Sequence, residues 1–402
     1  MRCSLRFFAI VLTTAVYSMV WYGCVNEEQG SLFDPDATFA PAPSITSITP
    51  SGGSQAGVDT LTITGTNFSA TLGLNIAYFN STTAALLQAS PTQLLLKAPF
   101  VLGDSVRVRT AVYGSDQLSN LIYYKLTAAI AGFGSLLPGQ FGKAIATDAS
   151  GNLFVSMSSN TGDIGIRRIT SAGDTMTFAP PTPLIAEWSS LKMGPGGNLY
   201  VARNARAVFR IPPGGGSAPS IWVSSQIFPS SARIVDFDFD ANQYLWAGGN
   251  NANVYCIKQD QTVKTYPFLA NVRSFRVFNG YLYMSAFKDS AEGIWRAPII
   301  FDSIGVAEKY FDFATAFPGK PVQGITFSAA GNLYIATTAP EGLVIVTPSK
   351  TYSAPYSAYK DLFGTGLKSL AWGSGDALYA ISINGTLSKV NTRTTGAPYY
   401  GQ

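Results

Sequence analysis

The sequence predicts an all-β protein in which an immunoglobulin-like sandwich is followed by a six-bladed β-propeller. First, six of the leucines that are followed directly by an aromatic residue recur at intervals of roughly 45 residues, the length of one four-stranded blade. Second, a stretch of about 85 residues before this repeat consists of short alternating segments separated by turns. Third, only 12% of residues are charged and 39 are glycine, which suits many short strands joined by tight turns. The six leucines are Leu153, Leu199, Leu245, Leu282, Leu333 and Leu378.

The charge composition argues against several classes of function. The net charge is +4 and no run of Lys or Arg forms a basic patch, so nucleic-acid binding is not expected. The chain contains no histidine, which removes His-assisted nucleophile triads, His general bases and His metal ligands. We therefore expect no catalytic residue, no cofactor and no metal site.

Residues 1–23 have the pattern of an export signal. Arg2 and Arg6 precede an apolar run over residues 7–21, and Gly23 and Cys24 follow it. A single membrane-spanning helix is the alternative. It is disfavoured because the run is short for a bilayer and acidic residues, not a basic stop, come after it.

Gly23 and Cys24 after an apolar run resemble the lipobox of bacterial lipoproteins. The resemblance implies that residues 1–23 are a lipoprotein signal peptide and that Cys24 carries the lipid, which anchors the chain without a spanning helix. A plain signal peptide is the alternative. The acidic pair after Cys24 also resembles the tag that sends some lipoproteins to the outer face of the outer membrane. The expected location is therefore that of an exported outer-membrane lipoprotein, with surface exposure left open as one of two orientations.

Residues 24–42 are expected to form a tether that its prolines stiffen into a spacer. The three cysteines fit this interpretation, because Cys3 leaves with the signal and Cys24 takes the lipid. Cys256 then remains alone in a predicted strand, where it is expected to be a small buried residue rather than a nucleophile.

Residues 43–127 alternate apolar and polar side chains, as half-buried strands do. Short strands with regular turns are typical of an immunoglobulin-type sandwich. The Gly-Thr-Asn-Phe turn at residues 65–68, with Ala98 and Pro99 later, resembles the IPT/TIG family. That resemblance implies a spacer or interaction module without catalytic residues, with Asn67 in a turn and Phe68 in the core. Strands are predicted at residues 44–50, 59–65, 74–79, 93–98, 105–112 and 121–126.

Residues 130–402 repeat a hairpin whose second strand carries the leucine–aromatic pair. Side chains alternate along a strand, so the two residues face opposite sides and each side can meet a neighbouring blade. The pattern at residues 324–336 resembles NHL-repeat and related six-bladed propellers, which implies the fold and leaves the activity open. Mostly small residues begin the inner strands, as a crowded axis requires: Ala144, Ser190, Asp236, Ser274, Gly324 and Ser369.

Propeller enzymes of the gluconolactonase kind hold a divalent metal on this axis through carboxylates and an asparagine. The predicted inner strands offer Asp236 and Asp238, and no matching Glu or Asn accompanies them. Asp236 is therefore interpreted as a hydrogen-bonded polar residue rather than a metal ligand. A basic column on the third strands is expected to lay its stems over aromatic rings: Arg168, Arg210, Arg296 and Lys389.

The loops between second and third strands lie together at one end of a propeller, and here they are rich in amides. Amides suit hydrogen bonding to sugar hydroxyls, and loops on rigid scaffolds often carry function. The alternative is that Asn and Gly only make the turns. The candidate ligand-binding residues are Arg203, Asn204, Arg206, Asn250, Asn251, Asn253, Lys288, Asp289 and Asn384.

Together these features predict a non-catalytic, lipid-anchored protein of the cell envelope. The sandwich would be a spacer, and the loop end of the propeller would bind a glycan or an extracellular or envelope protein. Two alternatives stay open: a propeller hydrolase or lactonase with an axial metal, and a structural or adhesive component of the envelope.

Overall fold

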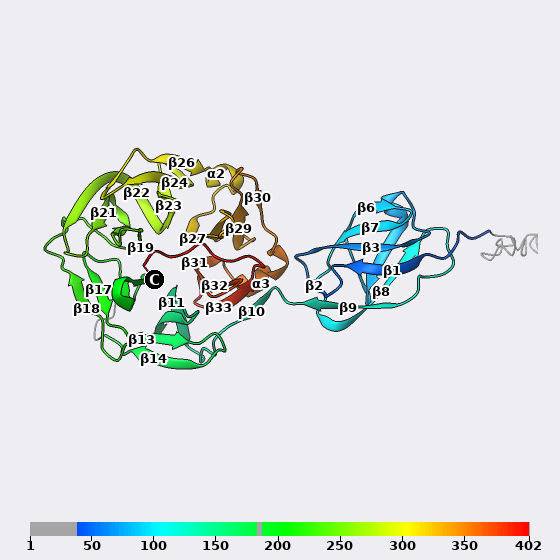
Figure 1. The fold of residues 1–402 in the computed structure, drawn as a ribbon, viewed down its shortest axis with the longest axis horizontal. Helices are drawn as coiled ribbons and strands as arrows, with labels where there is room; N and C mark the ends of the chain where they lie inside the picture. The colour runs from blue at the N-terminus through cyan, green and yellow to red at the C-terminus, as the bar shows by residue number, and fades with distance from the viewer. Residues whose placement is uncertain (1–37, 183–186, 402) are drawn as a thin grey trace, which may run out of the picture.

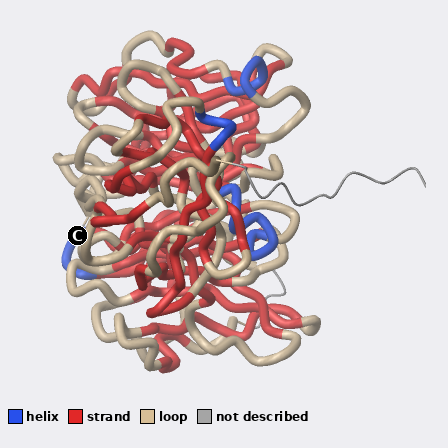
Figure 2. Tube along the Cα trace, turned by 90° about the vertical axis from the view of Figure 1, so that its right-hand side faces the viewer, coloured by secondary structure: helices blue, strands red, loops and turns tan. Residues whose placement is uncertain are grey.

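The computed structural model of the protein describes residues 38–182 and 187–401. Strands make up almost all of the regular structure and helices are confined to short turns (Figure 2), which confirms the all-β prediction. A ring of sheets carries a smaller sandwich at its rim (Figure 1). No helix in these residues is both long and apolar enough to cross a membrane. The predicted signal peptide, Cys24 and most of the predicted tether lie outside the described residues.

The sandwich consists of two facing sheets, with strand orders β1-β3-β7-β6 and β2-β9-β8-β4-β5. Every segment predicted from alternation forms a strand. Alternation does not reveal β2 or β5, which have two residues each, or the edge strand β6, whose residues are all half-buried or exposed. The elements are β1 (Ser44–Thr49), β2 (Ser54–Gln55), β3 (Thr60–Thr66), η1 (Leu72–Leu74), β4 (Asn75–Phe79), β5 (Thr82–Thr83), β6 (Leu86–Ser90), β7 (Gln93–Lys97), β8 (Gly103–Val112) and β9 (Ile122–Thr127).

Alternate residues of the sandwich strands meet between the two sheets, as Leu61 and Ile63 of β3 do, and both are fully buried. The turn after β3 has the predicted roles. Asn67 adopts a positive φ of 60°, and Phe68 is buried against Gly65. A Cβ at Gly65 would lie 2.6 Å from the Phe68 ring, so this packing requires glycine.

Six antiparallel blades follow one another around the ring in the described residues (Figure 1), which confirms the six-bladed prediction. From the axis outwards, the strands of blade 1 are β11 (Gln140–Thr147), β12 (Leu153–Ser159), β13 (Gly162–Ile169) and β14 (Thr175–Ala179), and those of blade 2 are β15 (Ser190–Gly194), β16 (Asn198–Ala202), β17 (Val208–Ile211) and β18 (Ser220–Val223). Blade 3 consists of β19 (Asp236–Phe239), β20 (Leu245–Gly248), β21 (Asn250–Ile257) and β22 (Val263–Phe278), and blade 4 of β22 again, β23 (Tyr281–Lys288), β24 (Ala291–Ile300) and β26 (Glu308–Phe311), with β25 (Ser303–Ile304) beside β24. Blade 5 consists of β27 (Val322–Phe327), β28 (Leu333–Thr337), β29 (Leu343–Val346) and β30 (Tyr352–Ser353), and blade 6 of β31 (Leu367–Trp372), β32 (Ala377–Ser382), β33 (Leu387–Asn391) and β10 (Ile130–Gly132). Short helices lie on the connections: η2 (Pro195–Gly197), α2 (Phe313–Ala316), η3 (Ser357–Tyr359) and α3 (Lys360–Phe363).

The leucine–aromatic pairs hold neighbouring blades together. All six pairs lie on the second strands of their blades and all are buried. In each blade the leucine packs into the cluster shared with the preceding blade, and the aromatic ring into the cluster shared with the following blade. Tyr200 of blade 2 thus packs in one cluster with Leu245 of blade 3. Tyr379 of blade 6 packs with Leu153 of blade 1, and this contact closes the ring.

Two backbone features complete the ring. β10, which directly follows the sandwich, pairs antiparallel with β33 and supplies the outer strand of blade 6. The first propeller strand is therefore hydrogen-bonded into the last blade. β22 is a single 16-residue strand that leaves blade 3 as its outer strand and enters blade 4 as its inner strand.

The sandwich is fixed to the side of blade 6. The Tyr359 hydroxyl accepts a hydrogen bond from the Ala129 N–H at 2.7 Å and donates one to the Ala56 carbonyl at 2.9 Å. Arg393 pairs with Asp59, with 2.8 Å between Nη2 and Oδ2. The sandwich therefore lies beside the ring rather than over its centre (Figure 1).

The C-terminal tail closes one end of the ring by running from β33 to the axis (Figure 1). The fully buried Arg276 of β22 donates hydrogen bonds to the carbonyls of Ala397 and Pro398 at 3.0 and 2.9 Å. Its guanidinium also pairs with Asp238 of β19 at 3.0 Å and lies 4.0 Å from the centroid of the Tyr399 ring. Arg276 therefore ties two inner strands to the tail.

A second charge cluster joins blades 3 and 4 away from the axis. Asp302, between β24 and β25, pairs with Lys258 and Lys264 at 2.6 Å each. Hydrogen bonds from these two ammonium groups lower the pKa of Asp302 to about 2. An unfolded aspartate has a pKa near ~3.9, so this pairing stabilises the fold above that pH and its contribution is lost as the pH falls towards 2.

Replacing Arg276 with Met is expected to lower the free energy of unfolding by about 3–5 kcal/mol, because Asp238 stays buried without its cation. Urea unfolding followed by tryptophan fluorescence measures the change. Lys309→Met removes a partly exposed partner of Asp312 and serves as the control, with an expected cost of about 0–1 kcal/mol. Equal effects of the two substitutions would contradict the role assigned to Arg276.

Replacing Asp302 with Asn is expected to lower the melting temperature at neutral pH, because the two lysines lose their counter-charge. The difference from the parent protein should shrink as the pH falls from about 4 to about 2, where the native carboxylate takes up its proton. Thermal melts of both proteins across this range measure it. A difference that stays constant down to the lowest pH would rule out the ionic contribution.

Candidate functional site

Several inner strands share a backbone irregularity near their starts. In β11, β22, β27 and β31 the register with the second strand of the blade shifts at this point. A β-bulge of this kind leaves a residue unpaired and re-aims its side chain. Four blades therefore begin their inner strands with a long polar side chain at the bulge: Lys143, Arg273, Gln323 and Lys368.

A cavity of about 230 Å³, here called the axial cavity, lies at this level of the ring. Asn204, from the loop between β16 and β17, lines it and is exposed. The cavity therefore opens at the end that carries the second-to-third-strand loops, opposite the C-terminal tail. This is the end that the sequence favours for a binding site. Each blade contributes to the lining, for example through Ile145, Lys192, Asp236, Arg273, Gln323 and Lys368.

The small residues that begin the inner strands leave room for this cavity. Apart from Ala144, all members of the predicted small column line it. At Gly324 a Cβ would lie 2.9 Å from the Lys368 carbonyl oxygen. The close approach of β27 to β31 therefore requires glycine at this position.

Both carboxylates on β19 are already engaged in hydrogen bonds. Asp236 accepts from the Phe275 N–H at 2.8 Å and from the Ser190 hydroxyl. Asp238 accepts from the Val277 N–H at 2.8 Å, in addition to its pairing with Arg276. Residues two apart on a strand share a face, so both carboxylates reach the backbone of β22. The interpretation of Asp236 as a hydrogen-bonded polar residue is confirmed.

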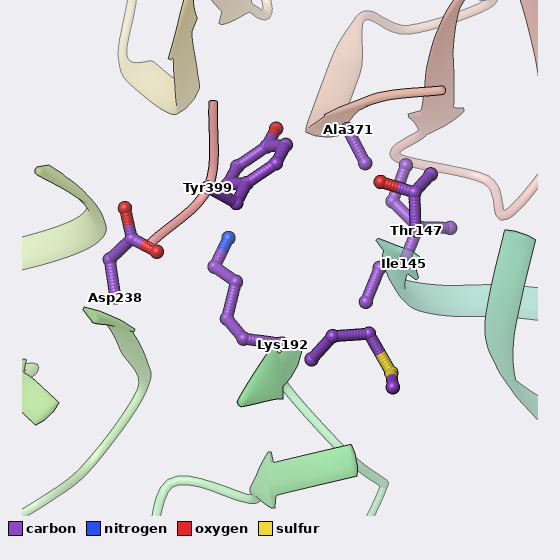
Figure 3. A pocket seen from close by; sticks show the side chains of 8 residues that line it. Ile145, Thr147, Lys192, Asp238, Ala371 and Tyr399 are labelled. Atoms are coloured by element: carbon purple, nitrogen blue, oxygen red, sulfur yellow. The ribbon is translucent and has the colours of Figure 1, made fainter. Parts of the chain in front are cut away.

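Lys192 separates the open part of the axis from the closed part. It lines the axial cavity and also a smaller cavity of about 10 Å³ that Asp238 and Tyr399 complete. Its ammonium points towards the Tyr399 ring (Figure 3), with 5.9 Å between Nζ and the ring centroid. Burial disfavours the charged form, but the carboxylates of Asp236 and Asp238 outweigh burial, so the pKa of Lys192 is raised. The charge of Lys192 is therefore compensated.

Four other polar side chains of the axial cavity make no hydrogen bond or ion pair with any residue that the structure describes. Polar groups held in a concave site without partners are available to a ligand. They are Asn204, Gln323, Lys368 and Ser369.

Lys368 differs from the two basic residues at equivalent bulges. Lys143 pairs with Glu187 at 2.9 Å, and Arg273 makes two hydrogen bonds to Glu292 at 2.6 and 2.8 Å. Burial lowers the pKa of Lys368 and the nearby charge of Lys143 lowers it further, while the Glu187 carboxylate opposes the shift without cancelling it. Lys368 therefore faces the cavity as a half-buried amine that forms no ion pair or hydrogen bond with the described residues, and the Glu187 carboxylate, which pairs with Lys143, compensates its charge only in part.

The side chains that face the axial cavity are hydrogen-bonding groups. Across residues 38–182 and 187–401, no group of three His, Cys, Asp or Glu side chains could hold a metal ion. Cys256 is fully buried in β21, and burial raises the pKa of its thiol to about 12. The prediction that Cys256 is a buried structural residue is confirmed. Ammonium, amide and hydroxyl groups remain as the donors that face the cavity.

Among the predicted loop residues, Asn204 lies at the axial cavity. The neighbouring Arg203 is a packing residue, because its guanidinium lies 4.7 Å from the Phe209 ring and 5.6 Å from the Trp188 ring. Arg206 is half-buried and does not line the axial cavity. Only one residue of this predicted loop cluster therefore reaches the axis.

Three other predicted residues meet in a shallow groove between blades 3 and 4. Asn250, Lys288 and Asp289 line this groove, whose volume is about 470 Å³. Lys288 pairs with Asp289 at 2.6 Å, and its ammonium lies 4.9 Å from the Trp295 ring. Lys288 and Asp289 therefore compensate each other's charge, and the Asp289 side chain stays exposed.

The remaining predicted residues lie apart from these. Asn253 hydrogen-bonds the Tyr255 side chain, and the backbone of Asn251 pairs with Ala270. Asn384 lines a separate groove of about 610 Å³ near the start of blade 1 and accepts a hydrogen bond from Thr365 at 3.3 Å. The nine candidates therefore do not form one site.

The basic column on the third strands has the predicted stacking role at two positions. Arg296 lies 4.5 Å from the Tyr281 ring, and Lys389 lies 5.6 Å from the Phe133 ring. Arg210 instead hydrogen-bonds the Tyr200 side chain. This column supports the blades and does not contribute to the axial cavity.

Sequence reasoning missed the basic and amide residues that face the axis. Most of these residues lie at the bulges, one position before the column of small residues that begins the inner strands. Lys192 of blade 2 lies two positions after that column's Ser190 and also lines the cavity. Read across the blades, the preceding column contains three basic residues and no acidic one: Lys143, Ser189, Val235, Arg273, Gln323 and Lys368.

Comparison with known protein families finds a match over the sandwich. Residues 43–126 match the IPT/TIG domain family, in agreement with the resemblance seen in the sequence. The search of curated proteins found no match.

Solved structures share the fold at low sequence identity. An auxiliary nutrient binding protein from Bacteroides thetaiotaomicron is 10% identical, with a TM-score of 0.51, covering 89% of this chain and 98% of that one. A calcium-binding protein, regucalcin, from Agrobacterium tumefaciens is 16% identical, with a TM-score of 0.53, covering 67% and 97%. A gluconolactonase from Xanthomonas campestris is 11% identical, with a TM-score of 0.50, covering 63% and 86%. These similarities show the fold: an immunoglobulin-like sandwich followed by a six-bladed propeller.

Proposed function

We propose that this protein is a non-catalytic, lipid-anchored, carbohydrate-binding protein of the cell envelope. Lipid on Cys24 would hold it in the outer membrane, and the sandwich would act as a spacer. The axial cavity would receive one sugar residue of a glycan.

The observation that carries this proposal is the set of unpartnered polar side chains at the axial cavity. The amides of Asn204 and Gln323 and the hydroxyl of Ser369 can donate to and accept from sugar hydroxyls. The cavity volume of 230 Å³ corresponds to roughly eight water molecules at about 30 Å³ each. That space suits a single sugar ring. A protein partner could place only a single side chain in it.

The donor groups at the axis fit a divalent cation poorly. A calcium ion takes about 6–8 oxygen ligands, mostly carboxylates and carbonyls. Here Asp236 and Asp238 already accept hydrogen bonds from the protein, and the Lys192 ammonium lies near both. The axial side chains therefore favour binding of an organic ligand over the alternative of a metal-dependent lactonase.

The structural neighbours are compatible with this proposal but do not decide it. The nutrient binding protein matches both parts of the chain, whereas the gluconolactonase covers only 63% of it. Because one propeller scaffold hosts binding proteins and enzymes alike, we base the proposal on the axial side chains.

Filling the axial cavity is expected to abolish glycan binding. Ser369→Trp places an indole in the cavity, so affinity for any glycan identified on an array should fall by at least about ten-fold. Titration calorimetry of the detergent-solubilised full chain measures the loss. Ser217→Trp, at an exposed site away from the cavity, is the matched control and should bind normally. Undiminished binding by the Ser369 variant would place the site elsewhere.

Removing the lipid attachment site is expected to release the protein from the membrane. Cys24→Ala should move the chain from the membrane fraction to the soluble fraction, because no acyl chains would remain to hold it. Fractionation of cells with immunodetection measures the shift. Cys256→Ala removes a buried thiol instead and should leave the distribution unchanged. Retention of the Cys24 variant in the membrane would exclude anchoring through this residue.

A further inference from the structure

We propose that the sugar bound in the axial cavity carries a negative charge, a carboxylate or a sulfate, and that the Lys368 ammonium binds it. This inference rests on the proposed function, because it concerns the same cavity. It narrows the ligand from glycans in general to acidic glycans.

The charges around the cavity are compensated least at Lys368, which has no ion-pair partner of its own among the described residues and is only partly offset by Glu187. Lys143 and Arg273 each have a glutamate partner, at 2.9 Å and at 2.6 Å. Lys192 faces the carboxylates of Asp236 and Asp238. Among the described residues, Lys368 faces this cavity without an ion pair or hydrogen bond. A bound anion would supply the missing counter-charge.

The backbone holds Lys368 in place for this role. The β31 bulge lies between Leu367 and Ser369, so Lys368 is the unpaired residue that leaves the ladder and lines the cavity. Partial burial without a partner is unfavourable for an ammonium group, and an anionic ligand would offset that cost. Gln323 and Ser369 line the same cavity and can bond the other oxygens of the sugar.

The surroundings of the cavity favour one acidic sugar over a highly charged polymer such as nucleic acid. Glu187 and Glu292 lie beside the basic residues of the bulges and would repel closely spaced phosphates. Nucleic-acid sites instead gather many unpaired Lys and Arg side chains on one face. A single free ammonium in an enclosed space matches a single negative group.

A glycan array probed with four versions of the full chain tests the inference. The array carries neutral glycans such as dextran and laminarin oligosaccharides, uronate glycans such as oligogalacturonate and heparosan fragments, and sulfated glycans such as carrageenan fragments. The variants are Lys368→Gln, which removes the charge, and Lys368→Arg, which keeps it. Lys320→Gln is the matched control, because Lys320 is exposed and lies outside the cavity. The unmodified chain is the reference, and thermal melting checks that each variant is folded.

The inference predicts binding to uronate or sulfated glycans that Lys368→Gln weakens roughly ten-fold or more, which corresponds to about 1.4 kcal/mol. Lys368→Arg should retain most of the affinity, and Lys320→Gln all of it. Comparison of the uronate and sulfate arms then identifies the negative group.

Two results would overturn the inference in distinguishable ways. Binding of neutral glycans alone, blocked by Ser369→Trp but unaffected by Lys368→Gln, would refute the charge and leave the carbohydrate-binding function standing. Failure of every glycan class to bind would refute both.

Discussion

The ring depends on one repeated contact, in which the second strand of each blade turns a leucine towards one neighbour and an aromatic ring towards the other. Successive side chains of a strand point to opposite faces, so one dipeptide per blade serves two interfaces. Burying a side chain of this size stabilises a fold by about 1.5–3 kcal/mol. Because Tyr379 and Leu153 meet across the two ends of the repeat, the same contact also closes the circle.

The axial cavity is a consequence of that closure. The second strands contribute a leucine and an aromatic ring to every interface between blades, so the inner strands can begin with small residues near the axis and carry bulges there. The two ends of the axis then differ. Arg276 holds the tail across one end, while Lys368 and its neighbours line the other. An exported binding protein would keep its lipid anchor on the sandwich side and present the open end to ligand.

The sequence predicts the fold well because its signals are local. The alternation and the turn residues can be read within about 12 residues, and the blade period follows from the return of that short pattern roughly every 45 residues. The bulges cannot be read in this way, because they depend on the register between paired strands. Arg276 bonds carbonyls of Ala397 and Pro398 far along the chain, and β10 is only three residues long, so neither carries a local signal. Of the nine candidate loop residues, Asn204 lines the axial cavity and the other eight do not. Which loops approach the axis depends on how the ring closes, so the sequence carries no local signal for it.

The central claim is that the ring closes around an axis open at one end, where Lys368 is accessible, and closed at the other, where Lys192 is held. Labelling of the native protein with a small amine reagent, read lysine by lysine by mass spectrometry, tests this most directly. We expect Lys368 to react at a rate comparable with the exposed Lys320, helped by its lowered pKa, and Lys192 to stay unmodified. Rapid labelling of Lys192 together with protection of Lys368 would contradict it.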